Sequence, residues 1–456
     1  MSEAQGGNRP WITWYGDDFT GSAAVMEALA FSGVDSVLFT ELPTPEFLAR
    51  FSGCRGIGLA SSARRPGPGW LRAHRPAPLR FLDTLGAPLL HYKICSTFDS
   101  APEAGSIGQA IEIALSIRPA QAVPMLTAAP RMRRYQAFGH LFAGSFDGVF
   151  RLDRHPVMAH HPVTPMHEAD LLRHLARQTT LSAGLIDLEA LATDPQARLD
   201  ELVGAGARIL SIDNMNADSE VAAGRLIWEN RNRLGLVLGS QGIEYALTRH
   251  WAEIGLIAPA EAPGGAGRAD RIAAVSGSVS PMTAEQLGWA GAHGFELLPL
   301  DATQMLGDEA LMRAEEERAA RAACAAAGRG LSPLVHTAAG PGDPAVAAFR
   351  SALGQSGFDP ETANRRIGEA LGRVLDRVLR DTGLRRAVIS GGDSSGHALR
   401  RLGLQALTAI APTIPGAAIN RGHGTGQHDG LEIALKGGQM GSRDFFGWVR
   451  DGGGPR

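Results

Sequence analysis

The chain has 456 residues and a net charge of -3, with 44 Lys and Arg against 47 Asp and Glu, which argues against nucleic-acid and membrane-surface binding and favours small-molecule partners. It is long for a single core, so two domains are predicted. Three dispersed cysteines and a polar N-terminus without an apolar leader run argue against a disulfide framework, and we expect a cytoplasmic protein.

Short apolar runs alternate with helical patterns along the first half of the chain. This alternation is typical of βαβ units and predicts a mostly parallel sheet flanked by helices. The predicted strands lie in WITWYG, VDSVLFT, GCRGIGLA, PLLHYK, QAVPML, SAGLIDL, ARILSID and GLVLG.

The stretch APAEAPGGAGRA, residues 258–269, is rich in Ala, Pro and Gly without periodicity and indicates a linker between domains 1–257 and 270–456. The second domain repeats the pattern of strand, glycine or hydroxyl turn, and helix. The predicted class is therefore α/β, with two domains and an active site in the cleft between them. The late stretch RGHGTGQHDG is predicted to be a mobile loop, and we predict no zinc site from the histidines.

Two acids follow the first apolar run, in the stretch YGDDFTG, where open α/β sheets bind ligands. Asp17 or Asp18 could accept the proton of a sugar hydroxyl as that hydroxyl attacks phosphorus. The alternative is that one of them caps the following helix. Two adjacent acids together with Thr20 exceed what a cap requires, so we predict a ligand site.

A second polar stretch, KICSTFDS, begins at Lys93 and is followed by GSIG and a helix. The ammonium group can meet a substrate carboxylate, while Ser96, Thr97 and Asp99 suit a polyhydroxylated substrate. The alternative for Lys93 is a solvated surface lysine. Cys95 is predicted to pack as a small hydrophobe, because no cation or helix pattern marks it as a thiolate.

Three glycine- or hydroxyl-rich turns follow apolar runs in the second domain. Glycines let the backbone approach a ligand, and free N–H groups at a helix N-terminus favour an anion such as phosphate. The alternative for each turn is an ordinary helix cap. None has the ending of a P-loop, and none is a convincing dinucleotide fingerprint. The turns contain Ser276, Gly277, Ser278 and Ser280; Gly391, Gly392, Asp393 and Ser394; and Lys436, Gly437 and Gly438.

In this order, the motifs YGDDFTGS, KICSTFDS, RRYQAFG, HPVTPM, VSGSVSPMTAEQ, SGGDSSGHAL and LEIALKGGQMG resemble the four-carbon acid sugar kinase family over nearly the whole chain. The resemblance implies a sugar-acid-binding N-terminal domain and a nucleotide-binding C-terminal domain, with ATP and Mg²⁺ as cofactors. It implies Asp17, Asp18 and Lys93 as catalytic residues and adds Arg134, from RRYQAFG, to the substrate contacts. The metal ligands are unknown, and a homodimer is one candidate assembly.

Departures from the family pattern bear on the substrate. Many members carry an aspartate before the Ser-Thr pair and Arg-Gly after it, where this chain has Cys95 and Asp99-Ser100. That form is similar to the branch acting on 3-oxo acids such as 3-oxo-isoapionate and 3-oxo-tetronate, and SAPEAGSIG with RRYQAFG favours the former. The alternatives are a threonate or erythronate kinase, or a non-catalytic protein that binds sugar acids and nucleotides.

Overall fold

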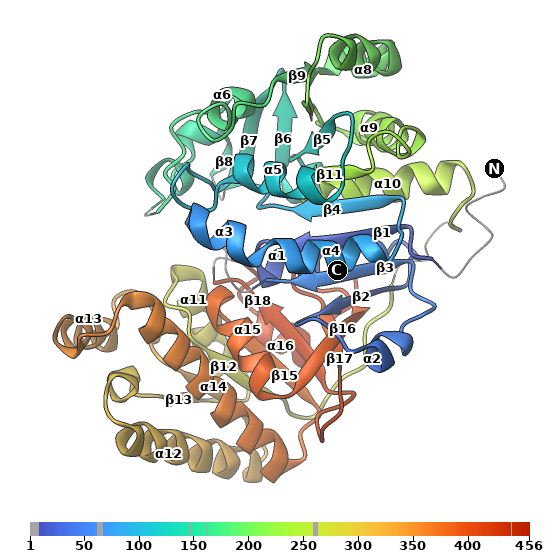
Figure 1. Ribbon diagram of the computed structural model, residues 1–456. Helices are drawn as coiled ribbons and strands as arrows, with labels where there is room; N and C mark the ends of the chain where they lie inside the picture. Colours follow the sequence, from blue (N-terminus) through green and yellow to red (C-terminus); the bar gives the residue numbers. More distant parts are fainter. Residues whose placement is uncertain (1–8, 62–66, 146, 162, 259–262, 439) are drawn as a thin grey trace. The chain divides into compact units, whose positions relative to one another are not determined.

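The computed structural model describes residues 9–61, 67–145, 147–161, 163–258, 263–438 and 440–456, without the side chains of residues 392–395. The chain forms two compact units, residues 1–261 and 262–456 (Figure 1). Each contains a mostly parallel sheet flanked by helices, which confirms the predicted class. The assignment of one active site to a cleft shared by the two units stays a prediction.

The sheet of the first unit is parallel, in the order β2-β3-β1-β4-β11-β5-β10-β9. Its strands β1, β3 and β4 are buried along their whole length, as expected of apolar runs covered on both faces. The strands are β1 (Ile12–Gly16), β2 (Ser36–Phe39), β3 (Gly56–Ala60), β4 (Leu89–Lys93), β5 (Val123–Leu126), β9 (Ala183–Ile186), β10 (Ile209–Ile212) and β11 (Leu236–Gly239).

Helices cover both faces of this sheet. Trp14 and His91 are paired in register and bond to α1 and α10, whereas their neighbours Tyr15 and Tyr92 point to the opposite face, toward the junction of α3 and α4. The helices are α1 (Phe19–Ala30), α2 (Pro45–Ala49), α3 (Pro68–His74), α4 (Pro76–Thr84), α5 (Ile107–Ile117), α6 (Leu171–Leu175), α7 (Leu188–Ala192), α8 (Pro195–Gly204), α9 (Ala217–Glu229) and α10 (Gly242–Glu253).

A small antiparallel sheet, β6 (Arg134–Ala137), β7 (His140–Ser145) and β8 (Gly148–Arg151), belongs to the same unit. The buried carboxylate of Asp213, just after β10, accepts hydrogen bonds from the backbone N–H groups of Phe138 and Gly139 at 2.5 and 3.0 Å. These bonds fix the small sheet to the main one.

The sheet of the second unit has the order β13-β14-β12-β15-β18-β17-β16. Its first five strands are parallel and the last two pairings are antiparallel. The strands are β12 (Ala273–Ser276), β13 (Phe295–Pro299), β14 (Ser332–His336), β15 (Arg386–Ser390), β16 (Leu404–Ala411), β17 (Ile419–Gly424) and β18 (Glu432–Lys436). The helices are α11 (Pro281–Gly291), α12 (Glu309–Gly328), α13 (Pro344–Ser356), α14 (Pro360–Thr382), α15 (Gly392–Arg401) and α16 (Phe445–Arg450).

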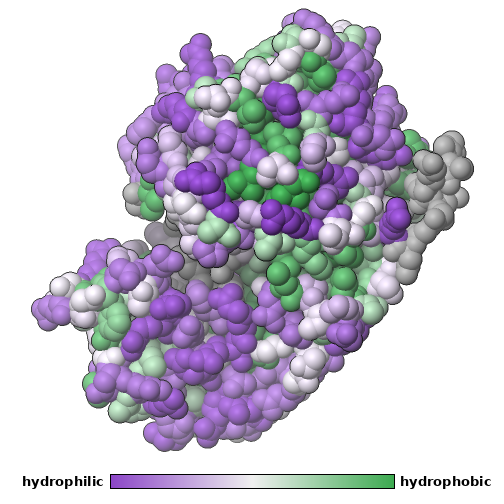
Figure 2. Space-filling model, viewed as in Figure 1, coloured by the Kyte–Doolittle hydropathy of each residue, from purple (hydrophilic) through white to green (hydrophobic). Residues whose placement is uncertain are grey.

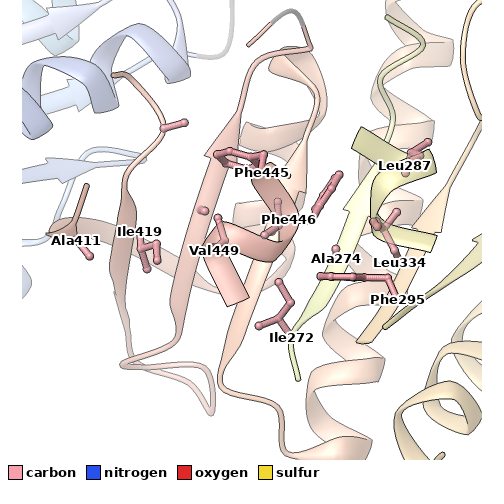
Figure 3. Packing of buried hydrophobic residues seen from close by; sticks show 14 residues of the cluster. Ile272, Ala274, Leu287, Phe295, Leu334, Ala411, Ile419, Phe445, Phe446 and Val449 are labelled. Carbon is pink, nitrogen blue, oxygen red and sulfur yellow. The ribbon is translucent and has the colours of Figure 1, made fainter. Parts of the chain in front are cut away.

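One core of this unit lies between the sheet and the helices α11 and α16 (Figure 3). Phe445 and Phe446 of α16 and Leu287 of α11 pack there on Ala274 and Leu334 of the strands. On the opposite face, α12 and α14 bury apolar residues and expose hydrophilic ones (Figure 2). Alternation along the buried strands therefore directs successive side chains toward one or the other helical layer.

One segment differs in part from its sequence-based interpretation. Arg421–Gly424, predicted to be part of a mobile loop, lies in β17 and pairs with β16, because glycines there allow close contact with Leu404. Within the predicted linker, the N–H groups of Ala266 and Ala269 bond to the carbonyl groups of Gly452 and Arg450. The assignment of residues 258–269 as a linker stays a prediction.

Candidate functional site

Five strands of the first unit end in register. Ala60, Gly16, Lys93, Gly239 and Leu126 are consecutive partners across β3, β1, β4, β11 and β5. The turns that follow therefore meet at one edge of the sheet, the usual ligand-binding edge of such folds. The stretches containing Asp17, Asp18 and Lys93 are thus side by side.

The two adjacent acids occupy different surroundings. Asp18 is the N-cap of α1, and its Oδ1 accepts the N–H of Gly21 at 3.0 Å. Asp17 is buried, and its N–H donates to the carbonyl oxygen of Lys93 at 3.1 Å. The capping alternative thus holds for Asp18. Thr20, in the first turn of α1, is half-buried.

Lys93 is buried, with 2% of its surface exposed, and is therefore not a solvated surface lysine. Its Nζ donates to the carbonyl oxygen of Ile94 at 2.7 Å. A Cβ atom at Gly21 would collide with both the Lys93 ammonium and the Asp18 carboxylate, so the two charged groups lie around this glycine. The absence of a side chain at Gly21 makes room for this pair of opposite charges.

The turn after β4 carries the predicted hydroxyls. Thr97 is buried and Ser96 half-buried, and the Sγ of Cys95 lies 3.1 Å from the Oγ1 of Thr97. The Asp99 carboxylate accepts a hydrogen bond from Thr164, whose contact connects this turn to the segment after the small sheet. Asp99 thus has a structural contact besides its predicted role in substrate binding.

Arg134 begins β6 and is half-buried. Its Nη1 donates to the carbonyl oxygens of Met132, Arg133 and Gly144 at 3.2–3.3 Å. Among the described residues, its buried Nε has no hydrogen-bond partner. Burial lowers the pKa of Arg134, and the nearby Cys95 partly opposes this shift. The side chain therefore retains a donor that an anionic ligand could use.

The sequence-based prediction missed two features of this edge. Ser240 and Gln241 follow β11, the strand next to β4, and an added Cβ at Gly242 would collide with the Ala128 carbonyl oxygen. The signal was present, since Ser-Gln-Gly follows an apolar run. Arg75, between α3 and α4, lies over the rings of Tyr15 and Tyr92. The residues around Arg75 in the sequence do not predict this contact.

Five strands of the second unit also end in register, at Pro299, His336, Ser276, Ser390 and Lys436. The three predicted turns follow β12, β15 and β18, which are neighbours in the sheet. The structure therefore brings the three turns together at one edge.

Hydroxyl groups connect the first and third of these turns. Ser280 caps α11 by accepting the N–H of Thr283 at 3.1 Å, and its Oγ donates to the carbonyl oxygen of Gly438. The Thr283 hydroxyl lies 3.0 Å from the Ser278 hydroxyl and 3.2 Å from the same carbonyl oxygen. A Cβ at Gly438 would meet the Ser278 hydroxyl, so this position has no room for a side chain. In the same turn, the N–H of Gly277 donates to the Ser390 carbonyl oxygen at 3.0 Å.

Lys436, at the end of β18, is fully buried. Its Nζ donates to the Gly437 carbonyl oxygen at 3.0 Å and lies 3.5 Å from the Thr283 hydroxyl. Burial lowers its pKa to about 8. This lysine is therefore held inside the group of turns, and its pKa is below that of an exposed lysine.

The middle turn depends on Gly391, which has φ 133° and ψ 122°, a conformation available essentially only to glycine. Its N–H donates to the Lys436 carbonyl oxygen at 2.8 Å. Gly392 begins α15, while the side chains of Asp393 and Ser394 lie outside the described part of the structure. The turn thus leads directly into a helix N-terminus, where the dipole favours an anion.

Within the described ranges, no group of three or more His, Cys, Asp or Glu side chains is placed to hold a metal ion. Among the same residues, no helix has the length and apolar character needed to span a bilayer.

Two domain families match the sequence: a sugar-binding N-terminal domain over residues 12–247 and a nucleotide-binding C-terminal domain over residues 273–446. The chain is 47% identical over 444 residues to a 3-oxo-isoapionate kinase of Paraburkholderia graminis, covering 97% of this chain and 94% of that one. The chain belongs to the four-carbon acid sugar kinase family. A Methylobacterium radiotolerans 3-oxo-tetronate kinase is 31% identical, with 95% and 97% of the two chains covered.

A solved structure from Salmonella typhimurium LT2 has the same fold, with a TM-score of 0.76 and 25% identity over 96% of this chain and 98% of that one. These comparisons confirm the predicted family and an acid sugar kinase as the class of enzyme. A kinase of this family uses a nucleotide and a sugar acid. The individual site residues stay predictions.

Proposed function

We propose that this protein transfers the γ-phosphoryl group of ATP to a hydroxyl of 3-oxo-isoapionate or a closely similar short 3-oxo acid. The observation that carries the proposal is the 47% identity to a 3-oxo-isoapionate kinase over nearly the full length of both chains. The strand ends of the two units support the proposal. Those of the first unit bring together charged groups that suit a sugar acid, and those of the second bring together turns that suit phosphates.

In this proposal the sugar acid binds at the strand ends of the first unit. Lys93 and the Nε of Arg134 contact its carboxylate, while Thr20, Ser96, Thr97 and Asp99 bind its hydroxyl groups. Asp17 or Asp18 accepts the proton of the attacking hydroxyl. The buried position of Lys93 supports this role, since desolvation strengthens its attraction for an anion.

The nucleotide binds at the turns of the second unit. Backbone N–H groups at the start of α15 and the Lys436 ammonium suit its phosphates. The glycines allow close approach of the phosphates, and the hydroxyls hold the turns together. The contacts are assigned to Ser276, Gly277, Ser278, Ser280, Gly391, Gly392, Asp393, Ser394, Lys436, Gly437 and Gly438.

Mg²⁺ fits this site as part of a metal-nucleotide complex. It keeps several waters and binds through substrate phosphates together with few protein groups, so a dedicated cluster of carboxylates is not required. The described turns offer hydroxyl groups and backbone carbonyl oxygens, which are ligand types suited to a hard cation. When bound, the ion would neutralise charge that develops on the phosphates.

The direct test is to measure ATP consumption with a panel of 3-oxo-isoapionate, 3-oxo-tetronates, threonate and erythronate, each with and without Mg²⁺. We expect the highest kcat/KM with 3-oxo-isoapionate and no turnover without the metal ion. Thermal stabilisation by ADP and by the sugar acid is measured in parallel. Stabilisation without turnover of any acid would indicate a non-catalytic binding protein, and preference for threonate or erythronate would assign the chain to that branch.

We also propose that the protein works in the cytoplasm, because no disulfide joins any two of its three cysteines, Cys54, Cys95 and Cys324. We further propose that the protein forms a homodimer, and light scattering of the purified protein measures its molar mass in solution directly. A molar mass equal to that of a single chain would exclude the homodimer.

A further inference from the structure

Arg75 is one of the largest fully buried side chains, with 1% of its surface exposed. Arg75 lies at the junction of α3 and α4, and its backbone N–H donates to the Leu71 carbonyl oxygen. Its guanidinium carbon lies 4.9 Å from the ring centroid of Tyr15, 5.6 Å from that of Trp70 and 5.8 Å from that of Tyr92. Three aromatic rings thus surround a permanently charged group.

The strand geometry connects this arginine to the candidate site. Tyr15 and Tyr92 are partners in register on the face of the sheet that Arg75 covers. Asp17 directly follows β1, and its N–H continues the strand pairing by donating to the Lys93 carbonyl oxygen. It lies two residues after Tyr15, a spacing that directs strand side chains to the same face. Lys93 follows Tyr92 by one residue and therefore points to the opposite face, where it lies beside Asp18. Each acid thus has a different basic neighbour.

Electrostatic interactions support this pairing. Burial opposes the charge of Arg75, but its neighbours Tyr92, Tyr15 and Asp17 outweigh that cost and raise its pKa, and Arg75 also donates a hydrogen bond to the Tyr15 side chain. A guanidinium this deeply buried requires an opposite charge, since an uncompensated buried charge is strongly destabilising. Asp17, itself buried, supplies a negative charge on the side of the strand ends.

We propose that Arg75 is a positioning residue for the kinase reaction, which holds the Asp17 carboxylate aimed at the acceptor hydroxyl. The inference rests on the proposed function and deepens it. In this proposal Arg75 acts through Asp17, whereas Asp18 accepts the Gly21 N–H and lies near the Lys93 ammonium. The orientation of Asp17 therefore depends on Arg75, whereas that of Asp18 does not.

A double-mutant cycle tests the proposal with Arg75→Met, Asp17→Asn and the double variant. Arg75→Met is expected to lower kcat at least about fivefold, because coupled neighbours interact strongly. In the Asp17→Asn background the same change should alter kcat less than about twofold. In the Asp18→Asn background it should keep its full effect. Arg75→Lys retains the charge and should restore part of kcat.

Arg118→Met is the matched control. Arg118 is another partly buried arginine of this unit, but it bonds to the Ala87 and Pro88 carbonyl oxygens before β4, away from the strand ends. Its removal should lower stability and act equally in the wild-type and Asp17→Asn backgrounds. Equal losses of kcat from Arg75→Met in both backgrounds would overturn the proposal, because they would assign Arg75 a general structural role.

A second readout does not need a substrate. Urea unfolding of the four proteins of the cycle measures whether Arg75 and Asp17 stabilise one another, and the proposal requires effects that are clearly non-additive. Additive effects would overturn it whatever the activity. A wild-type protein that turns over no sugar acid would instead refute the proposed function, while the unfolding cycle would still decide the pairing.

Discussion

In both units the candidate site residues lie at the ends of the parallel strands, but the residue types there differ. The first unit places charged side chains there: Asp17, Asp18 and Lys93, with Arg75 and Arg134 close by. The second places serine and threonine hydroxyls, glycines and one lysine. The difference fits two kinds of ligand, since a small acid is oriented by fixed charges, whereas phosphates bind well to backbone N–H groups at a helix N-terminus.

The two buried lysines show the same contrast. Lys93 lies beside a carboxylate, around the space at Gly21. Lys436 bonds to a carbonyl oxygen and lies near a hydroxyl, and burial lowers its pKa to about 8. We therefore expect Lys93 to have an opposite charge nearby before any ligand binds, and Lys436 to gain its main opposite charge from the nucleotide.

The largest effect should come from the acids of the first unit. Changing the true base to Asn is expected to lower kcat by about 100- to 10,000-fold with ATP affinity unchanged. Asp17→Asn and Asp18→Asn are measured by steady-state kinetics, with the exposed Asp35→Asn, at the other end of the sheet, as the control. If both variants keep a kcat near that of the wild type, neither acid is the general base. Substrate positioning and electrostatic stabilisation would then account for the rate acceleration.

The next effect concerns the backbone of the second unit. Gly391→Ala places a side chain on a residue with φ 133°, a strain of about 1–3 kcal/mol, and should weaken ATP binding about tenfold or more. Isothermal titration calorimetry measures the affinity. Gly288→Ala is the control, because its Cβ would meet nothing within 4 Å. If Gly391→Ala binds ATP like the control, this turn does not belong to the nucleotide site.

Lys93→Met should act on substrate binding rather than on the chemical step. If Lys93 contacts the substrate carboxylate in the ground state and the transition state alike, its loss raises KM for the sugar acid while kcat changes little. Loss of one hydrogen bond to a charged group predicts a rise of about tenfold or more. A fall in kcat with KM unchanged would show that Lys93 serves the reaction instead.

The smallest effect is a pH dependence confined to the second unit. As pH rises through about 8, Lys436 loses its proton, so ATP affinity should fall, and it should not fall in Lys436→Met. The folded-state pKa is below the ordinary value of 10.5, so the unfolded chain binds more protons in this window and stability should rise with pH there. Parallel pH profiles of ATP affinity in both proteins would contradict this assignment.

The sequence predicted the strands and the turns at their ends, because buried parallel strands are continuous apolar runs that end abruptly at polar residues. It could not predict which side chains meet beneath those turns. Arg75 is 60 residues from Tyr15 along the chain, and their contact depends on how α3 and α4 pack against the sheet. The burial of Lys93 likewise depends on the space at Gly21.

The glycines of the sequence did not by themselves distinguish a loop from a strand. In RGHGTGQHDG, glycines indicated a loop, yet Gly422 and Gly424 lie in β17, where Leu404 and the Gly403 carbonyl oxygen leave no room for a side chain. In the turns at Gly391 and Gly438, the same residue type marks the candidate nucleotide site. Local sequence does not separate these two uses, because the neighbours that exclude a side chain are distant along the chain.

In the proposed reaction, the first unit binds the sugar acid and the second binds the nucleotide. Calorimetric titration of ADP and of 3-oxo-isoapionate into wild type, Lys93→Met and Gly391→Ala tests it most directly. We expect Lys93→Met to lose affinity for the sugar acid and keep it for ADP, and Gly391→Ala to lose affinity for ADP and keep it for the sugar acid. Two results would contradict this division of roles. One is a Lys93→Met protein that loses ADP binding but keeps sugar-acid binding, and the other is a Gly391→Ala protein that loses sugar-acid binding but keeps ADP binding.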